Sequence, residues 1–288
     1  MNRSYLIAGA LLGIAFVVFI GVVIVIGLAP SEAPAESGNI ATPAPAVPTP
    51  PVPFDPIRLA WFYRPPEGLG LDELAARFDF FILTNNDEDE LRALKESGVG
   101  APVLQYLRMD AIHDPGDCSR QPLRNQAANQ VGDICRIREE HPDWFLRDVD
   151  GNPVTDDDFV LMDPASPGWR DFWLERARVA QEYLGWDGVF LDNAEASLSK
   201  RERRGKLLAA YPDDASYQAA VAGFIEYVYT TYFQPSGRPL MANIIALREP
   251  TAWFDYLQVL DGAMKEAFAV DWDNGYLSAS DWEQHLAI

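Results

Sequence analysis

Short apolar runs alternate with amphipathic stretches from Phe54 to the last residue, Ile288. Six runs have the length of buried β-strands, and they cover residues 58–63, 78–84, 102–107, 188–193, 239–244 and 261–267. Apolar residues recur every three to four positions in the segments between them, which predicts helices over residues 71–77, 87–97, 167–184, 217–233 and 251–259, and a further helix from 281. Strands that alternate with helices are typical of a parallel sheet with crossover helices.

This order predicts an α/β fold of the (β/α) TIM-barrel type. A doubly wound dinucleotide-binding sheet would carry a Gly-rich turn after its first strand, and the sequence has none. A full barrel has eight βα units, whereas this chain supplies about six. Residues 108–161 are predicted to be irregular, and the 22 residues after Glu266 are too few for two more units. We therefore expect a barrel that is incomplete at its C-terminal end, with two exposed edge strands that a second chain could complete.

Residues 1–29 are predicted to be a transmembrane signal anchor. No charge occurs between Tyr5 and Ala29, and roughly 20 apolar residues span a bilayer as a helix. A long signal peptide cut near Ala33 or Ala35 is the alternative. Residues 30–53, rich in Ala and Pro, are predicted to be a disordered linker. The domain at 54–288 is then expected outside the cytoplasm, on a single-pass protein of the cell membrane.

The net charge of −20 argues against nucleic acid as a partner, because phosphates need cationic contacts, and it fits a neutral or cationic substrate. The chain has two cysteines, Cys118 and Cys135, which are predicted to form a disulfide outside the cytoplasm. His141 and scattered carboxylates near it do not have the spacing of metal ligands. Neither a metal nor another cofactor is expected.

Polar or aromatic residues follow each predicted strand, where the active site of a parallel barrel lies. Asp192 and Glu266 are the candidate catalytic pair, because glycoside hydrolysis uses one carboxyl group to protonate the leaving oxygen and another to attack or to activate water. Alternatively, Asp192 caps the next helix and Glu266 is a surface residue beside Lys265. The candidate substrate-binding residues are Trp61, Tyr63, Asn85, Tyr106, Arg108, Asp163, Asn193 and Asn243, although the aromatic ones could equally be core residues.

Three segments, at residues 141–148, 162–171 and 187–193, resemble a known family. It is the family of glycoside-hydrolase-like TIM barrels described as hypothetical glycosyl hydrolases, which is similar to the endo-α-1,4-polygalactosaminidase group and more distantly to α-galactosidase barrels. The resemblance covers about residues 54–271. It implies a catalytic Asp after the fourth strand, here Asp192, and an acidic partner in an Asp-Gly-x-Met-x-Glu segment after the sixth, here Glu266. The chain departs from the family pattern by ending soon after that strand.

The expected function is that of a membrane-anchored, extracytoplasmic glycoside hydrolase acting on a polysaccharide or oligosaccharide. Asp192 would be the nucleophile or base and Glu266 the general acid, and analogy with related barrels favours a retaining mechanism. The alternative is a surface carbohydrate-binding protein without catalysis, whose truncated barrel keeps only the sugar cleft. Another hydrolase class has no support, because the sequence lacks a Gly-x-Ser-x-Gly elbow and a His-Glu-x-x-His stretch.

Overall fold

The computed structural model describes residues 59–63, 69–84, 86–203, 205–246, 250–266, 268, 270–271 and 275–286. The predicted signal anchor and linker lie outside these residues, and so does Asn85. Within the described ranges, no helix combines the length and the apolar character needed to cross a membrane.

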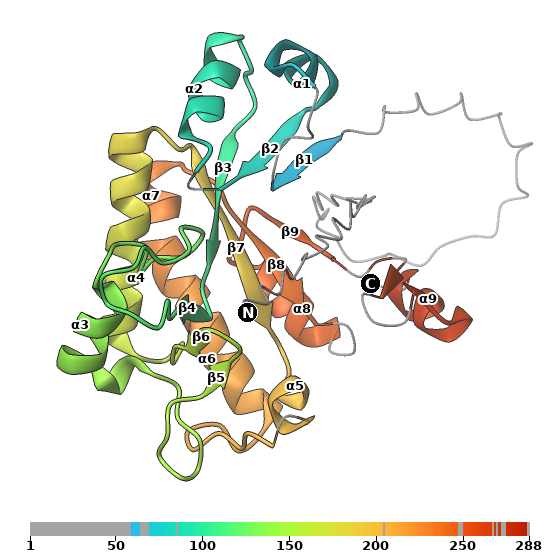
Figure 1. Ribbon diagram of the computed structural model, residues 1–288. Helices are drawn as coiled ribbons and strands as arrows, with labels where there is room; N and C mark the ends of the chain where they lie inside the picture. Colours follow the sequence, from blue (N-terminus) through green and yellow to red (C-terminus); the bar gives the residue numbers. More distant parts are fainter. Residues whose placement is uncertain are drawn as a thin grey trace, which may run out of the picture.

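Six parallel strands form the main sheet, in the order β1-β2-β3-β7-β8-β9. They are β1 (Ala60–Tyr63), β2 (Phe80–Leu83), β3 (Val103–Arg108), β7 (Gly188–Glu195), β8 (Leu240–Ile245) and β9 (Gly262–Met264). The sheet is curled, and β1 and β9 stand at its two ends (Figure 1). Among the described residues the architecture is therefore a half-barrel, which agrees with the incomplete (β/α) barrel that the sequence predicts.

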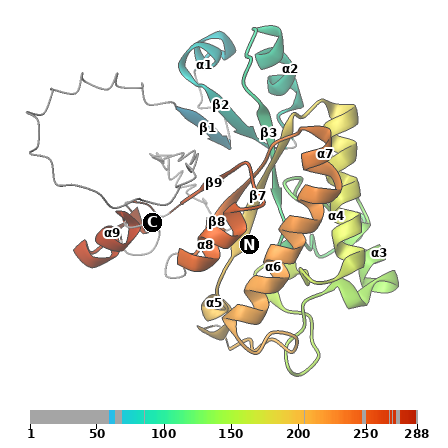
Figure 2. The same ribbon diagram turned by 180° about the vertical axis from the view of Figure 1, so that it is seen from behind.

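Helices cover the outer face of this sheet (Figures 1 and 2). Residue Ser166 caps α4, with its hydroxyl accepting from the Trp169 N–H, and Gly185 at φ 87° ends the π-helical turn that follows, as expected for a left-handed C-cap. The crossover helices are α1 (Leu71–Arg77), α2 (Glu88–Glu96), α4 (Pro167–Val179), α6 (Asp214–Val228), α7 (Gln234–Ser236) and α8 (Pro250–Leu257), with π-helical turns at Ala180–Leu184 and Tyr229–Phe233. Each predicted helix is present with bounds within a few residues.

The prediction of an irregular section at residues 108–161 is wrong in part. The section contains an antiparallel sheet in the order β4-β6-β5, formed by β4 (Ala111–His113), β5 (Thr155–Asp156) and β6 (Phe159–Leu161), besides α3 (Asp133–Glu140) and a 3₁₀ turn at Pro142–Trp144. Strands of two or three residues are too short to show a periodicity. This small sheet lies beside the C-terminal ends of β3 and β7, together with α5 (Ser199–Arg203) (Figure 1).

A short antiparallel pair of strands likewise lies between β9 and the last helix, where the sequence shows no strand pattern. Its strands are β10 (Val270–Asp271) and β11 (Gly275–Tyr276), and α9 (Ala279–Leu286) follows. Two residues per strand again leave no pattern that sequence reasoning can detect.

Side chains of the main sheet alternate between two apolar layers, because successive residues of a strand point to opposite faces. The concave face carries a small cluster, which consists of Phe62, Tyr63, Phe80, Ile82, Leu104, Tyr106, Phe190, Met241 and Met264. The outer face packs against the helices, where Trp169 and Trp173 of α4 are fully buried. Their indole N–H groups donate to the carbonyl oxygens of Met109, at 3.3 Å, and Arg108, at 3.0 Å. These bonds fix the end of β3 against α4.

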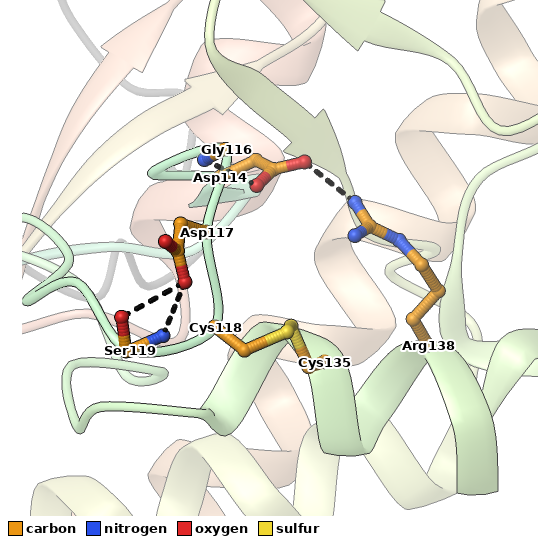
Figure 3. The surroundings of a disulfide bond; sticks show 7 residues. All are labelled: Asp114, Gly116, Asp117, Cys118, Ser119, Cys135 and Arg138. Carbon is orange, nitrogen blue, oxygen red and sulfur yellow. Dashed lines mark hydrogen bonds and ion pairs between the residues drawn. A yellow bond between two sulfur atoms is a disulfide. The ribbon is translucent and has the colours of Figure 1, made fainter.

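A disulfide joins Cys118 to Cys135, with the two Cα atoms 5.9 Å apart, as the sequence predicts. Figure 3 shows the ion pair beside it between Asp114 and Arg138, with an N–O distance of 2.6 Å. The disulfide joins the segment after β4 to α3, so the residues between the two cysteines form a closed loop.

Replacing both cysteines by serine should lower the free energy of unfolding by about 3 kcal/mol. A disulfide that closes a loop of this size removes a comparable amount of chain entropy from the unfolded state. Denaturant titration of the full-length protein with and without the substitutions measures the difference. Wild-type protein treated with a reductant is the control and should match the double variant. Equal stability of oxidised wild type and double variant would contradict the prediction.

Candidate active site

Each of three polar residues of the site comes two positions after an apolar residue that faces the concave side. Phe190 on β7 precedes Asp192, Met241 on β8 precedes Asn243, and Met264 at the end of β9 precedes Glu266. A period of two keeps side chains on one face of a strand. The strands therefore carry these three polar side chains to the concave side, at their C-terminal ends.

Asn243 lies between the two candidate catalytic carboxylates. Its side chain is buried, and its Nδ2 donates to Asp192 Oδ1 at 3.0 Å and to Glu266 Oε2 at 2.8 Å. Two oxygen atoms that lie within 3.0 Å of one nitrogen can be at most about 6 Å apart. The structure thus brings Asp192, Asn243 and Glu266 into one cluster, as the strand-end argument predicts.

Tyr106 on β3 completes the surroundings of Asp192. Its hydroxyl donates to Asp192 Oδ2, and its ring lies edge-on against Tyr63, with centroids 5.3 Å apart. Burial raises the pKa of the Tyr106 hydroxyl, and the neighbouring Asp192 carboxylate adds to the effect. The phenol therefore stays protonated and remains a hydrogen-bond donor at any physiological pH.

Burial also raises the pKa of the Asp192 carboxyl group above its ordinary value of 3.8. The hydrogen bonds from Tyr106 and Asn243 act in the opposite direction, because both donors favour the charged form. The environment therefore combines burial, which resists ionisation, with two donors that stabilise the carboxylate once it forms.

A second polar cluster adjoins Asp192 and is built around Asp110. Arg108 binds Asp110 through Nε and Nη2, both at 3.0 Å, and Asn193 Nδ2 donates to Asp110 Oδ1 at 3.2 Å. The Arg108 guanidinium lies over the ring of Phe159 at 4.1 Å. Burial alone would lower the pKa of Arg108, but Asp110, with smaller contributions from Asp192 and Tyr106, raises it overall. Arg108 is therefore a fixed cation at the edge of the site.

Asp110 is a site residue that the sequence did not indicate. It lies beyond the end of β3, in the section predicted to be irregular, and nothing in the pattern there assigns its side chain to a face. Its charge raises the pKa of Asp192, whereas that of Arg108 lowers it. The only signal available was the spacing Arg108-x-Asp110, which is common in any acidic sequence.

Trp61 does not belong to the site, and its prediction as a sugar-binding residue needs correction. It packs on the outer face, with its ring 5.0 Å from that of Phe78 next to α1. Its neighbour Phe62 faces the concave side, 5.5 Å from Phe190. The register accounts for this, since Trp61 pairs with Phe81 of the outer layer and Phe62 pairs with Ile82 of the concave layer.

Asp163 also lies apart from the two carboxylates. It precedes α4, where its Oδ1 accepts from the Ala165 N–H at 2.9 Å and from the Tyr211 hydroxyl. It therefore orders the start of a helix. Asn85 cannot be placed, because it lies outside the described residues.

The contacts do not support the alternative roles, which were a helix cap for Asp192 and a surface position beside Lys265 for Glu266. Asp192 is followed by the remainder of β7 up to Glu195 and not by a helix, so it caps none. Glu266 is partly buried and bound by Asn243, while the buried ammonium of Lys265 has no hydrogen-bond partner among the described residues. In the part of the chain that is described, no group of three His, Cys, Asp or Glu residues could hold a metal ion.

The curled parallel sheet with helices on its outer face defines an incomplete (β/α) barrel fold. The chain belongs to hypothetical glycosyl hydrolase family 15, whose sequence profile matches residues 103–288. This result confirms the family that the sequence segments resemble. Comparison with curated proteins gave no significant match.

Among solved structures, the chain is similar to the glycoside hydrolase domain of PelA from Pseudomonas aeruginosa. The identity is 20%, the match covers 81% of this chain and 79% of that domain, and the TM-score is 0.52. It is also similar to Ega3 from Aspergillus fumigatus, solved in complex with galactosamine, with 11% identity, coverage of 71% and 63%, and a TM-score of 0.40. The similarity to the PelA domain supports the barrel fold.

The raised pKa of Asp192 predicts how the free energy of unfolding depends on pH. A carboxyl group whose pKa is higher in the folded than in the unfolded protein contributes stability that is complete below pH 3.8 and is lost as the pH rises through the folded value. Asp192→Asn removes the ionisation, so the variant should gain stability relative to wild type between about pH 4 and pH 7, by about 1.4 kcal/mol for each unit of the pKa shift. Thermal unfolding of both proteins across this pH range measures the gain. Asp150→Asn, at an exposed turn, is the control and should show no such trend. A gain that is the same at both ends of the range would contradict the raised pKa.

Proposed function

We propose that the protein is a glycoside hydrolase in which Asp192 and Glu266 form the catalytic carboxyl pair. The observation that carries the proposal is the shared amide of Asn243, which holds an oxygen of each carboxylate within 3.0 Å of one nitrogen. Membership of hypothetical glycosyl hydrolase family 15 supports the same class of activity.

The hydrogen bonds favour Asp192 as the nucleophile and Glu266 as the general acid. A nucleophilic carboxylate reacts in its charged form, and Asp192 accepts from both Tyr106 and Asn243, which stabilise that form. Glu266 is only partly buried and follows the end of β9, so it is placed to meet the leaving group of a bound sugar chain.

The spacing of the carboxylates favours retention of configuration. Retaining glycosidases place the two carboxyl groups about 5–5.5 Å apart and inverting ones about 6.5–9.5 Å. The oxygens joined by Asn243 are at most about 6 Å apart. An amide that aims its two N–H bonds, which diverge by about 120°, at one carboxylate each would set them about 5 Å apart.

The substrate class follows from charge and from the aromatic side chains of the site. Tyr63 is partly buried and packs edge-on against Tyr106, whose hydroxyl binds Asp192, so its ring is the aromatic surface nearest the site. The net charge of −20 disfavours an anionic polymer. The proposed substrate is therefore a neutral or cationic polysaccharide or oligosaccharide.

A second candidate function is carbohydrate binding without catalysis. The observation that favours it is the open sheet, in which β1 and β9 are both end strands among the described residues. An open cylinder could keep the sugar cleft and still hold the substrate too loosely for hydrolysis.

Hydrolysis assays on full-length protein separate the two candidates. Asp192→Asn and Glu266→Gln should each lower turnover of neutral or amino-sugar polysaccharides by about 10³-fold or more, because each removes one of the two groups that the reaction needs. Asp150→Asn and Glu139→Gln alter exposed carboxylates elsewhere and should keep wild-type activity. Proton NMR of the fresh product should show retained anomeric configuration. Wild-type turnover in either site variant would remove that residue from the mechanism, and binding without hydrolysis by wild type would favour the second candidate.

We also propose that residues 1–29 anchor the protein in the cell membrane, with residues 54–288 on the extracytoplasmic side. The support is the uncharged apolar stretch from Tyr5 to Ala29. Full-length protein should sediment with membranes and resist carbonate extraction, whereas a version without residues 1–29 should be released. A mature secreted form that begins between residues 31 and 36 would show that the segment is a cleaved signal peptide.

A further inference from the structure

A cavity of about 340 Å³ lies on the outer face of β3, between α2 and α4. Gln105 and Leu107 of β3 form its floor. They alternate with Tyr106, which points to the concave face and binds Asp192. The cavity is therefore separated from the candidate active site by the thickness of the sheet. Its volume falls at the lower end of the range of about 300–1,000 Å³ for small-molecule sites.

The loop closed by the Cys118–Cys135 disulfide forms one wall of this cavity. Seven of the lining residues lie between the two cysteines, among them Gln121, Asn129 and Gln130. The loop is also held from within, since Gln121 Nε2 donates to the Asn129 carbonyl oxygen at 2.7 Å, and the buried Gln126 donates to that of Leu123 at 2.9 Å. The wall is thus preorganised before any ligand arrives.

Amide side chains dominate the polar part of the lining. There are five of them, from Gln105, Gln121, Gln126, Asn129 and Gln130. An amide offers both donors and acceptors, as a sugar hydroxyl does. The side chains of Asn129 and Gln130 make no hydrogen bond to any described residue, so their capacity is available to a ligand.

The floor of the cavity departs from the usual composition of a parallel sheet. Residues that face the helices in such a sheet are normally apolar, yet Gln105 occupies one of these positions and is almost fully buried. Gln181 of the adjoining π-helical turn is equally buried, and its Nε2 donates to Gln105 Oε1 at 3.4 Å. The Gln181 Oε1 atom has no partner in the described part of the chain. Two buried amides are thus kept where aliphatic side chains would pack better.

Each charged side chain of the lining has an opposite charge near it. Arg176 binds Asp133 at 2.9 and 3.2 Å, a carboxylate that it shares with Arg136, and Arg124 attracts Glu88, whose pKa is raised by burial. Leu107 and Val131 add an aliphatic surface suited to the C–H face of a sugar ring. This combination fits an uncharged, hydroxyl-rich ligand better than an anion.

We propose that this cavity is a second carbohydrate site, distinct from the Asp192–Glu266 pair, which binds one neutral sugar residue. Such a site would hold a chain on the outside of the barrel while another part of it occupies the concave face. The disulfide-closed loop supplies the recognition surface.

Hydrogen–deuterium exchange of the full-length protein tests the proposal, because it localises binding. The probes are galactose, glucose and N-acetylgalactosamine, with glucuronate as the anionic comparison. Each neutral sugar that binds should slow exchange in residues 121–131, equally in wild type and in Asp192→Asn. The double variant Asn129→Ala/Gln130→Ala should need a sugar concentration about ten-fold higher or more to reach the same protection.

Asn152→Ala combined with Gln234→Ala is the matched control, since both amides are exposed and lie elsewhere; it should leave the protection unchanged. Protection that persists at the same sugar concentration in the Asn129/Gln130 variant would overturn the proposal, and so would its absence with every neutral sugar. Stronger protection by glucuronate than by the neutral sugars would overturn the ligand class.

Discussion

The alternation of side chains across one curled parallel sheet is the constraint on which the other features depend. It aims Phe190 and Asp192, Met241 and Asn243, and Tyr106 at the concave side. The same alternation turns Gln105 and Leu107 outward, toward α2 and α4. Residues that are adjacent in sequence therefore serve different surfaces of the molecule. A shift of one residue in the register of β3 would exchange the two sets.

The amide of Asn243 offsets part of the electrostatic repulsion between the two carboxylates of the concave site. Two carboxylates that lie close together repel each other, and burial of Asp192 removes hydration, so both effects disfavour charge. Asn243 donates to both carboxylates, and at Asp192 its hydrogen bond opposes the effect of burial on the pKa. Its own Oδ1 is buried and finds no partner among the described residues, a loss of about 1–3 kcal/mol. The reverse orientation would aim that oxygen at two acceptors, so the carboxylates determine which way the amide points.

The long elements and the strand-end residues could be predicted because they have periodic patterns. Asp192, Asn243 and Glu266 follow clear apolar runs, and the structure brings them together. Trp61 was misplaced because the sequence shows where a strand ends more clearly than which of its residues face inward. Asp110 was missed, and so were β4, β5 and β6, because strands of two or three residues have no detectable period. The contacts of Asp110 with Arg108 and Asn193 depend on how the small sheet packs beside β3, and only tertiary structure determines that packing.

The order of the strands also explains how an open sheet can hold a complete carboxyl pair. The residues of the site come from β3, β7 and β8 and from the segment after β9, and these four strands are consecutive neighbours. The hydrogen bonds from Tyr106 to Asp192 and from Asn243 to Asp192 and Glu266 therefore join neighbouring strands of the described sheet, and these three bonds do not need β1 to meet β9. Glu266 follows a three-residue strand at one end of the described sheet. Since that strand pairs only with β8 among the described residues, the bond from Asn243 on β8 helps to replace the support that a closed barrel would give. The same bond that sets the spacing of the carboxylates thus also helps to hold one of them in place.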